Sequence, residues 1–193
     1  QTRAVEFANK YNVPVRVLSS FNNGNGTLIS LKEDTMENAL VSGIASQKNQ
    51  VKFTLHGVGD IPGTAFKILG PISDAEIEVD VIVQNVSVDG KTDFTFTVSS
   101  EDQETVIKVL ESIKKEVDYR ELIVDSNIAK VSLVGVGMRS QAGVASKAFK
   151  ALSENNVNIQ IICTSEIKIT MVIDEQLIDK AVSVLHKEFE LEK

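Results

Sequence analysis

An internal repeat is the feature of this sequence that most constrains its fold. The segment Val51–Gly59 is apolar at alternate positions and ends in a Gly-x-Gly turn, and Val131–Gly137 repeats that pattern. In each copy a second glycine-containing loop follows, and after it come a stretch with helical periodicity and another apolar strand. A repeat of this kind predicts two copies of one folding unit. It also places two similar loop-and-helix sites in one chain, a pattern that suggests ligand sensing.

Charge and composition exclude several classes of protein. The 193 residues carry a formal net charge of -7 and a pI near 4.9, which argues against nucleic acid or an anionic membrane as a partner. No apolar run is long enough to span a bilayer. The single cysteine, Cys163, excludes an internal disulfide and fits a reducing, cytoplasmic compartment, and we expect it to be buried in a strand as a small hydrophobic residue. Because the chain starts at Gln1 without an initiator Met or a signal peptide, we expect a fragment or a trimmed piece of a longer chain.

The first part of the chain differs from the two repeats. The apolar spacing in 4–11 predicts a short amphipathic helix, which Pro14 prevents from continuing. Short strands are expected at 15–18 and from Thr27, on either side of a turn rich in Asn and Gly. The polar run 32–38 is interpreted as a linker, so the first predicted domain is 1–38.

The first repeat predicts the element order β-α-β-β-α-β, a ferredoxin-like unit and an α+β fold. We expect its first helix to end or kink at Gly70-Pro71, because proline removes a donor and clashes with the preceding turn. The expected elements are strands at 51–55, 79–83, 94–98 and 120–124, an Asp89-Gly90 hairpin turn, and helices from Gly63 and from Ser100 to Val117.

The second repeat lacks a final strand. Strands are expected at 129–136, 159–164 and 167–173, with helices at 144–154 and 175–188, and then the chain ends. Because a half-built sheet would leave an unpaired edge, we infer that the apolar segment 39–46 supplies the missing strand. The first unit would then be inserted within the second, with domain boundaries at 39–50 for the donated strand, 51–126 for the first unit and 127–193 for the second.

The loop Gly57-Val58-Gly59-Asp60 is the strongest candidate for binding chemistry. Glycines allow close approach of the backbone to a ligand, and the following helix start offers free N–H groups to a carboxylate. Asp60 adds a negative charge suited to an ammonium group. A carboxylate and an ammonium together describe a free amino acid, although a lone Gly-x-Gly is more often a simple turn with its aspartate as a helix cap.

Other functional motifs are excluded. The glycine spacing is not that of a dinucleotide fingerprint, and no Gly-Lys-Ser/Thr completes a phosphate loop. His56 and His186 lie outside any metal-ligand spacing, and no paired-carboxylate, Ser-His-Asp or Cys-His arrangement is present, so catalytic and metal-binding residues are not expected. Polar clusters at 84–87 and 164–166 follow corresponding strands, where the sheet end should bring them near the glycine loops.

These residues resemble the regulatory region of aspartate kinases, which contains paired ACT domains. The resemblance rests on Gln84-Asn85-Val86-Ser87, on 131–138, on Val157-Asn158-Ile159 and on 163–169. The segment 11–21 resembles the end of the amino-acid kinase domain of that family, so the likeness covers essentially the whole chain.

The resemblance implies a function and a set of site residues. The family makes aspartyl phosphate from aspartate and ATP, and its ATP, Mg²⁺ and catalytic residues would belong to a kinase domain or subunit absent here, so no cofactor is expected in this chain. L-threonine, L-lysine or both would bind at ACT–ACT interfaces, usually across a homodimer, and inhibit the kinase allosterically. The residues that the family motif assigns to the effector site are Asp60 for the ammonium, Gly63, Thr64 and Ala65 for the carboxylate, Ile61 and Gln84 beside them, and Asn158, Ile159 and Ser165 from the second repeat.

Two alternatives remain open from the sequence. A structural subunit that dimerises and stabilises a catalytic partner without sensing an effector would have the same apolar strands and acidic surface. An independent enzyme is a third interpretation, and it lacks any catalytic constellation. The sequence leaves open which of the two amino acids binds.

Overall fold

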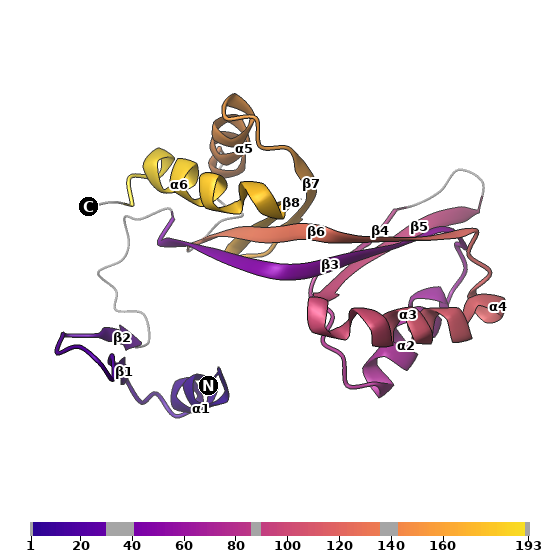
Figure 1. Ribbon diagram of the computed structural model, residues 1–193, viewed down its shortest axis with the longest axis horizontal. Helices are drawn as coiled ribbons and strands as arrows, with labels where there is room; N and C mark the ends of the chain where they lie inside the picture. Colours follow the sequence, from indigo (N-terminus) through magenta and orange to yellow (C-terminus); the bar gives the residue numbers. More distant parts are fainter. Residues whose placement is uncertain (1, 30–40, 86–89, 136–142, 192–193) are drawn as a thin grey trace. The chain divides into compact units, whose positions relative to one another are not determined.

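The computed structural model describes residues 2–29, 41–85, 90–135 and 143–191 (Figure 1). The chain divides into two units, the first covering 1–39 and the second 40–193. The first unit consists of helix α1 (Thr2–Lys10) and an antiparallel pair of short strands, β1 (Val15–Val17) and β2 (Thr27–Ile29). Its helix, turn and strands therefore occur in the order that the sequence predicts.

The second unit is built on one antiparallel sheet of six strands in the order β4-β5-β3-β6-β8-β7. The strands are β3 (Gly43–Gly59), β4 (Ile82–Gln84), β5 (Lys91–Ser99), β6 (Glu121–Val134), β7 (Ile159–Thr164) and β8 (Lys168–Asp174). The helices are α2 (Thr64–Asp74), α3 (Gln103–Ser112), α4 (Lys114–Val117), α5 (Val144–Glu154) and α6 (Ile178–Glu188), with 3-10 turns at Ser100–Asp102 and Glu175–Leu177.

Two long strands, β3 and β6, run through both halves of this sheet. The sequence predicts separate strands at 39–46 and 51–55, but from Gly43 onward they form one strand, and 120–124 and 129–136 likewise merge into β6. Ala39 and Leu40 lie outside the described residues. The strands continue because no proline interrupts them, and shifts of register near Gln47 and Gln50 absorb the change of direction. Gly43–Gln47 pairs with Val134–Lys130, so the start of β3 completes the sheet of the second half.

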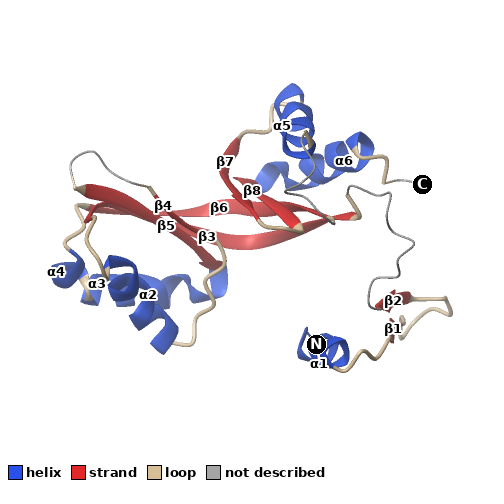
Figure 2. Ribbon diagram, turned by 180° about the vertical axis from the view of Figure 1, so that it is seen from behind, coloured by secondary structure: helices blue, strands red, loops and turns tan. Residues whose placement is uncertain are grey.

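Each half has its own apolar core. Val51, Phe53 and Leu55 of β3 pack with α2, α3 and β5, whereas Val131 and Leu133 of β6 pack with α5 and α6. The helices of the two halves cover opposite faces of the shared sheet, as Figures 1 and 2 show from two sides. The predicted α+β fold of two ferredoxin-like units, one inserted within the other, is confirmed. The residue boundaries assigned to the individual domains stay predictions.

Helix α2 passes through the Gly70-Pro71 pair, so of the two predicted outcomes, a helix end or a kink, the end is wrong. The ring of a proline clashes with the Cβ of the residue before it, and Gly70 has no Cβ. Buried Ile68 and Ile72, one on each side of the pair, hold the helix against the core. Packing of the apolar face therefore outweighs the hydrogen bond that Pro71 cannot make.

Three further predictions are corrected by the structure. Strand β4 covers only Ile82–Gln84, although Asp80 and Val81 already exchange backbone hydrogen bonds with Thr97. The helix expected from Ser100 to Val117 is divided at Ile113 into α3 and α4. Cys163 is exposed, because β7 is an edge strand and this part of it is not covered by a helix.

Candidate ligand-binding site

The loop after β3 has the geometry of an open ligand cradle. Asp60 and Ile61 are exposed, and the Asp60 N–H donates to the Gly90 carbonyl at 2.9 Å, which fixes the backbone of the loop. Among the described residues, the one hydrogen bond to the Asp60 carboxylate is a weak one, 3.4 Å from Gln84 Nε2 to Oδ1. The carboxylate therefore keeps acceptor capacity for a ligand ammonium group.

The start of α2 supplies the N–H groups for a carboxylate. Gly63 caps the helix with φ of 95°, a left-handed conformation that glycine adopts without strain. Among the described residues, the N–H groups of Gly63 and Ala65 have no acceptor. Thr64 differs, because its N–H donates to the Ile61 carbonyl and its buried hydroxyl donates to the Gly59 carbonyl at 2.8 Å. Thr64 therefore holds the loop in shape, while Gly63 and Ala65 face outward as free donors.

A β-bulge beneath the loop sets its direction. The pairing of β3 with β5 shifts between Leu55 and Val58, and Gly57 within this bulge has φ of 71°. The Gly57 N–H donates to Asp93 Oδ1 at 3.0 Å, and His56 Nδ1 lies 2.9 Å from Asp93 Oδ2. The bulge therefore depends on a carboxylate from the neighbouring strand, a role that the sequence analysis missed because Asp93 carries no motif.

The electrostatic state of Asp93 follows from these contacts. Partial desolvation acts to raise its pKa, but the hydrogen bond from Gly57, the His56 side chain and the nearby Arg120 outweigh that effect. The pKa of Asp93 consequently lies below its ordinary value of 3.8. Asp93 is thus a carboxylate at neutral pH and a stable acceptor for the bulge.

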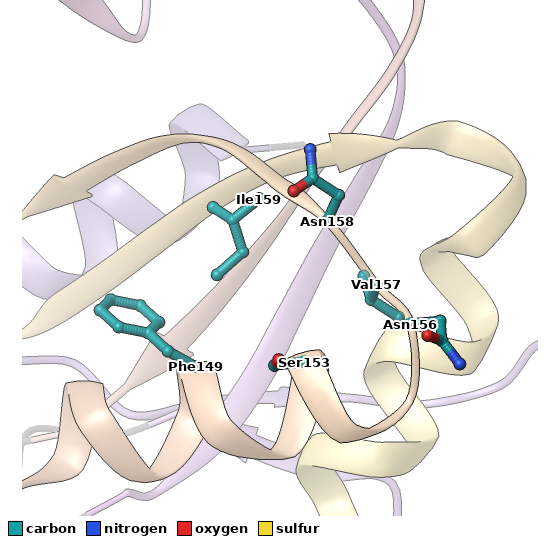
Figure 3. Close-up of a pocket in the computed structure, with 6 residues that line it drawn as sticks. All are labelled: Phe149, Ser153, Asn156, Val157, Asn158 and Ile159. Atoms are coloured by element: carbon teal, nitrogen blue, oxygen red, sulfur yellow. The ribbon is translucent and has the colours of Figure 1, made fainter.

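The remaining predicted site residues form a second group beside β7. Asn158 and Ile159 lie where the chain leaves α5 and enters β7, at an open cavity of about 460 Å³ (Figure 3). Ile159 points toward Phe149 of α5, whereas the Asn158 side chain points away from the helix (Figure 3). Ser165 is exposed in the turn between β7 and β8, where its N–H donates to the Lys168 carbonyl at 2.8 Å.

The structure does not bring the two groups together within one chain. Gln84 lies in β4 and Ile159 in β7, which are the two outermost strands of the sheet. Among the described residues, no hydrogen bond or ion pair joins the loop group to the β7 group. A ligand held by both groups would therefore need the second group from another copy.

The corresponding loop of the second repeat lies largely outside the described residues, which exclude 136–142. Its last residue, Gly143, caps α5 with φ of 104°, much as Gly63 caps α2. The two units therefore share the helix cap, and the comparison of their loops as ligand sites stays a prediction.

Two further kinds of feature, metal-ligand clusters and membrane-spanning helices, bear on the chemistry of the described part of the chain. Within these ranges no three His, Cys, Asp or Glu side chains gather where they could hold a metal ion. The helices described are all too short or too polar to cross a bilayer.

Comparison with known proteins gives the same architecture. Two ACT domain models match the chain, one at residues 55–118 and the other at 131–189. An aspartate kinase of Stutzerimonas stutzeri is 58% identical over 193 residues, which is all of this chain and 47% of that protein. The chain thus spans about half the length of the curated relatives it matches.

Solved structures of aspartate kinases and of their subunits also match this chain. A chain from a crystal structure of aspartokinase alpha and beta subunits is 46% identical, with a TM-score of 0.73, and the match covers 78% of this chain and 99% of that one. The ligand-free regulatory subunit of aspartate kinase from Thermus thermophilus is 33% identical over the same shares, with a TM-score of 0.74. E. coli aspartokinase III, solved in complex with lysine and aspartate, is 25% identical over 94% of this chain and 40% of that one, with a TM-score of 0.67.

Proposed function

Because this chain belongs to the aspartate kinase family and contains its regulatory region with paired ACT domains, we propose that it is an allosteric amino-acid sensor. In this proposal it binds L-threonine, L-lysine or both and shifts the kinase toward an inhibited state. Phosphorylation of aspartate, with its ATP and Mg²⁺, would be the task of a catalytic domain or subunit that partners this region.

The proposal rests on one observation, an exposed loop that presents both a carboxylate and free backbone N–H donors. Asp60 presents a carboxylate with one weak partner, and the free N–H groups of Gly63 and Ala65 lie a few residues away at the start of α2. This arrangement suits the ammonium and carboxylate groups of an α-amino acid. The lysine bound to the related E. coli aspartokinase III supports an amino acid as the ligand class.

A homodimer would complete this site. The loop group is open to solvent, and the Asn158 and Ile159 group lies on the opposite edge strand of the same sheet. We infer that a second copy brings its own β7 group, with Ser165, over the Asp60 loop. The exposed Ile82 of β4 and Ile162 of β7 give both edges apolar side chains that such a contact would cover.

The test is isothermal titration of the chain with L-threonine, with L-lysine and with both, beside sedimentation to follow dimerisation. Asp60→Ala should weaken binding by about tenfold or more, because it removes a charged partner of the ligand ammonium. Asp74→Ala, at the other end of α2, is the matched control and should bind as the wild type does.

The outcome separates sensing from a purely structural role. Unchanged affinity of Asp60→Ala for both L-threonine and L-lysine would refute the assigned loop. A folded wild-type dimer that binds neither amino acid would favour the structural dimerisation subunit over the sensor. An effect large enough for regulation needs only about 1–3 kcal/mol of coupling between effector and kinase.

A further inference from the structure

Two largely buried lysines cross the junction between the ACT units in opposite directions. Lys130 lies in the part of β6 that belongs to the second unit, and its Nζ donates to Asp80 Oδ2 of the first unit at 2.5 Å. Lys52 lies in the part of β3 that belongs to the first unit, and its Nζ donates to Gln160 Oε1 of the second unit. The Lys130 side chain is 3% exposed and the Lys52 side chain 17%. Each unit therefore holds a side chain of the other through a lysine ammonium group.

The alternation of side chains along the two long strands gives the lysines their direction. Their neighbours along the chain are core residues of their own unit, namely Val51, Phe53, Ala129 and Val131. Because successive side chains of a strand point to opposite faces of the sheet, each lysine points away from the core of its own unit. The helices of the two units cover opposite faces of the shared sheet (Figures 1 and 2), so each lysine points to the face on which the other unit is built.

The two acceptors occupy equivalent positions in the internal repeat. The segment Ile77–Asp80 of the first repeat corresponds to Val157–Gln160 of the second, so Asp80 corresponds to Gln160. Asp80 lies two residues before β4, and Gln160 is the second residue of β7. These strands are the two edges of the six-stranded sheet. The lysines therefore hold the same point of the repeat, the entry to the edge strand, although the acceptor is a carboxylate in one unit and a carboxamide in the other.

The backbone pairing is irregular at both of these points. The Asp80 N–H donates to the Thr97 carbonyl at 3.2 Å, and the next N–H along the chain donates to the Thr97 hydroxyl, so two residues face one. The pairing of β7 with β8 shifts between Ile159 and Ile161, so Gln160 is the extra residue of a bulge. A bulge interrupts the ladder, and an edge strand has only one neighbour to pair with. The contact from a lysine therefore supplies a fixed point where the backbone ladder is weak.

Each edge strand carries part of the proposed effector site. Gln84 of the loop group is the last residue of β4, and its Nε2 donates to Asp60 Oδ1 at 3.4 Å. Asn158 and Ile159 of the β7 group come directly before Gln160 in the chain. A charge-assisted hydrogen bond from an ammonium group is among the stronger polar contacts in a protein. Each lysine contact is thus placed to fix the position of one group of effector-site residues.

We propose that Lys52 and Lys130 are positioning residues for the effector site, each fixing the edge strand of the ACT unit to which it does not belong. Lys130 fixes β4 with the loop group, and Lys52 fixes β7 with the β7 group. The link to effector binding rests on the proposed function, whereas the fixing of the strands does not. Since both contacts cross the same junction, a change in the orientation of one unit against the other would release both strands. An effector held by these strands would therefore favour the orientation that keeps both contacts.

The experiment is hydrogen–deuterium exchange of the full chain without ligand, followed by mass spectrometry of peptides that cover β4 and β7. The test variants are Lys130→Met and Lys52→Met, which keep a long apolar side chain and remove the ammonium group. Lys48→Met is the matched control, because Lys48 is also in β3 and its ion pair, at 3.0 Å, reaches Asp179 of α6 rather than an edge strand. Urea unfolding followed by circular dichroism measures the global stability of each variant.

The expected result is a selective loss of protection in the strand that each lysine holds. In Lys130→Met the exchange of β4 should accelerate by about tenfold or more while that of β7 stays as in the wild type, and Lys52→Met should give the reverse. Lys48→Met should leave both strands unchanged. Asp80→Ala and Gln160→Ala remove the exposed partner of each contact, so they should show the same selectivity even if a lysine variant does not fold.

The pattern of exchange decides the proposal. A general loss of stability raises exchange in β4 and β7 alike, so equal acceleration in both strands, or none, would overturn the positioning role.

Titration with L-threonine and with L-lysine tests the link to the effector site. The amino acid that the wild type binds should bind each lysine variant about tenfold or more weakly. Wild-type affinity in a variant whose edge strand exchanges faster would overturn that link. A wild-type chain that binds neither amino acid would contradict the proposed function alone, because the exchange experiment needs no ligand.

Discussion

Replacing Gly57 by alanine should destabilise the fold through the bulge that aims the Asp60 loop. Gly57 has φ of 71°, and a Cβ at this position would lie 3.3 Å from the Cβ of Arg120. Gly59, two residues later, lacks a positive φ, and a Cβ there would meet nothing within 4 Å. The two glycines therefore form a matched pair in one strand, and only the first needs to be glycine.

The size of the effect follows from the difference between the two variants. A left-handed conformation costs an L-residue about 1–2 kcal/mol. Each glycine-to-alanine change also stabilises by about 0.4–1 kcal/mol through the unfolded chain, but this contribution is common to both variants and cancels in the comparison. Gly57→Ala should therefore be about 1–2 kcal/mol less stable than Gly59→Ala, and the close approach to Arg120 adds to this difference.

Urea unfolding followed by circular dichroism measures this difference. With a slope of about 2 kcal/mol per molar urea, the midpoint of Gly57→Ala should lie roughly 0.5–1 M below that of Gly59→Ala. Equal midpoints would refute the reasoning, because they would mean that the bulge does not require the left-handed conformation. Equal slopes are the control that both variants unfold from an equally compact state.

Two further predictions concern polar contacts that support the sheet. Asp93→Asn should lower the free energy of unfolding at neutral pH. This deficit should shrink as the pH falls below about 4, because the pKa of Asp93 is lowered in the folded protein and its protonation removes the advantage of the carboxylate. A deficit in the urea midpoint that stays constant as the pH falls would contradict the reasoning. Thr170→Val should lower the free energy of unfolding by about 1–3 kcal/mol, because it leaves the buried Ser132 hydroxyl without its hydrogen-bond partner at 2.9 Å. Adding Ser132→Ala removes that unpaired hydroxyl, so the double variant should recover part of the lost stability in the same urea unfolding assay.

Much of the second ACT unit could be predicted from the sequence. Helix α5 and strand β7 occur at the predicted residues, because Gly143 caps the helix start and Asn156, with φ of 56°, supplies the left-handed turn that follows the helix. Residues that favour a left-handed conformation, such as these two, fix the ends of a helix through local backbone preferences. The need for a donated strand also follows from the sequence, because the second unit would otherwise have an unpaired edge.

Other features depend on contacts that a local pattern does not contain. The continuity of α2 through Pro71 depends on its packing against the core, and the exposure of Cys163 depends on which strand lies at the edge of the sheet. The role of Asp93 requires knowledge of its neighbour across the sheet, the bulged residue Gly57. From the sequence alone, Lys130 would be expected on the exposed face of a strand. Its burial depends on the ion pair with Asp80, which lies 50 residues away in the sequence.

The long strand β3 has a consequence for the synthesis of this protein on the ribosome. Its first residues, Gly43–Gln47, pair with Val134–Lys130, so their partners are made some 90 residues later. The first ACT unit, whose strands and helices lie between these segments, can fold as soon as it emerges, while the start of β3 waits with its strand edge open. Such long-range pairing is slow and exposes the chain to misassociation. We therefore expect the final folding step to be the closure of the second unit onto a strand that was translated before the first.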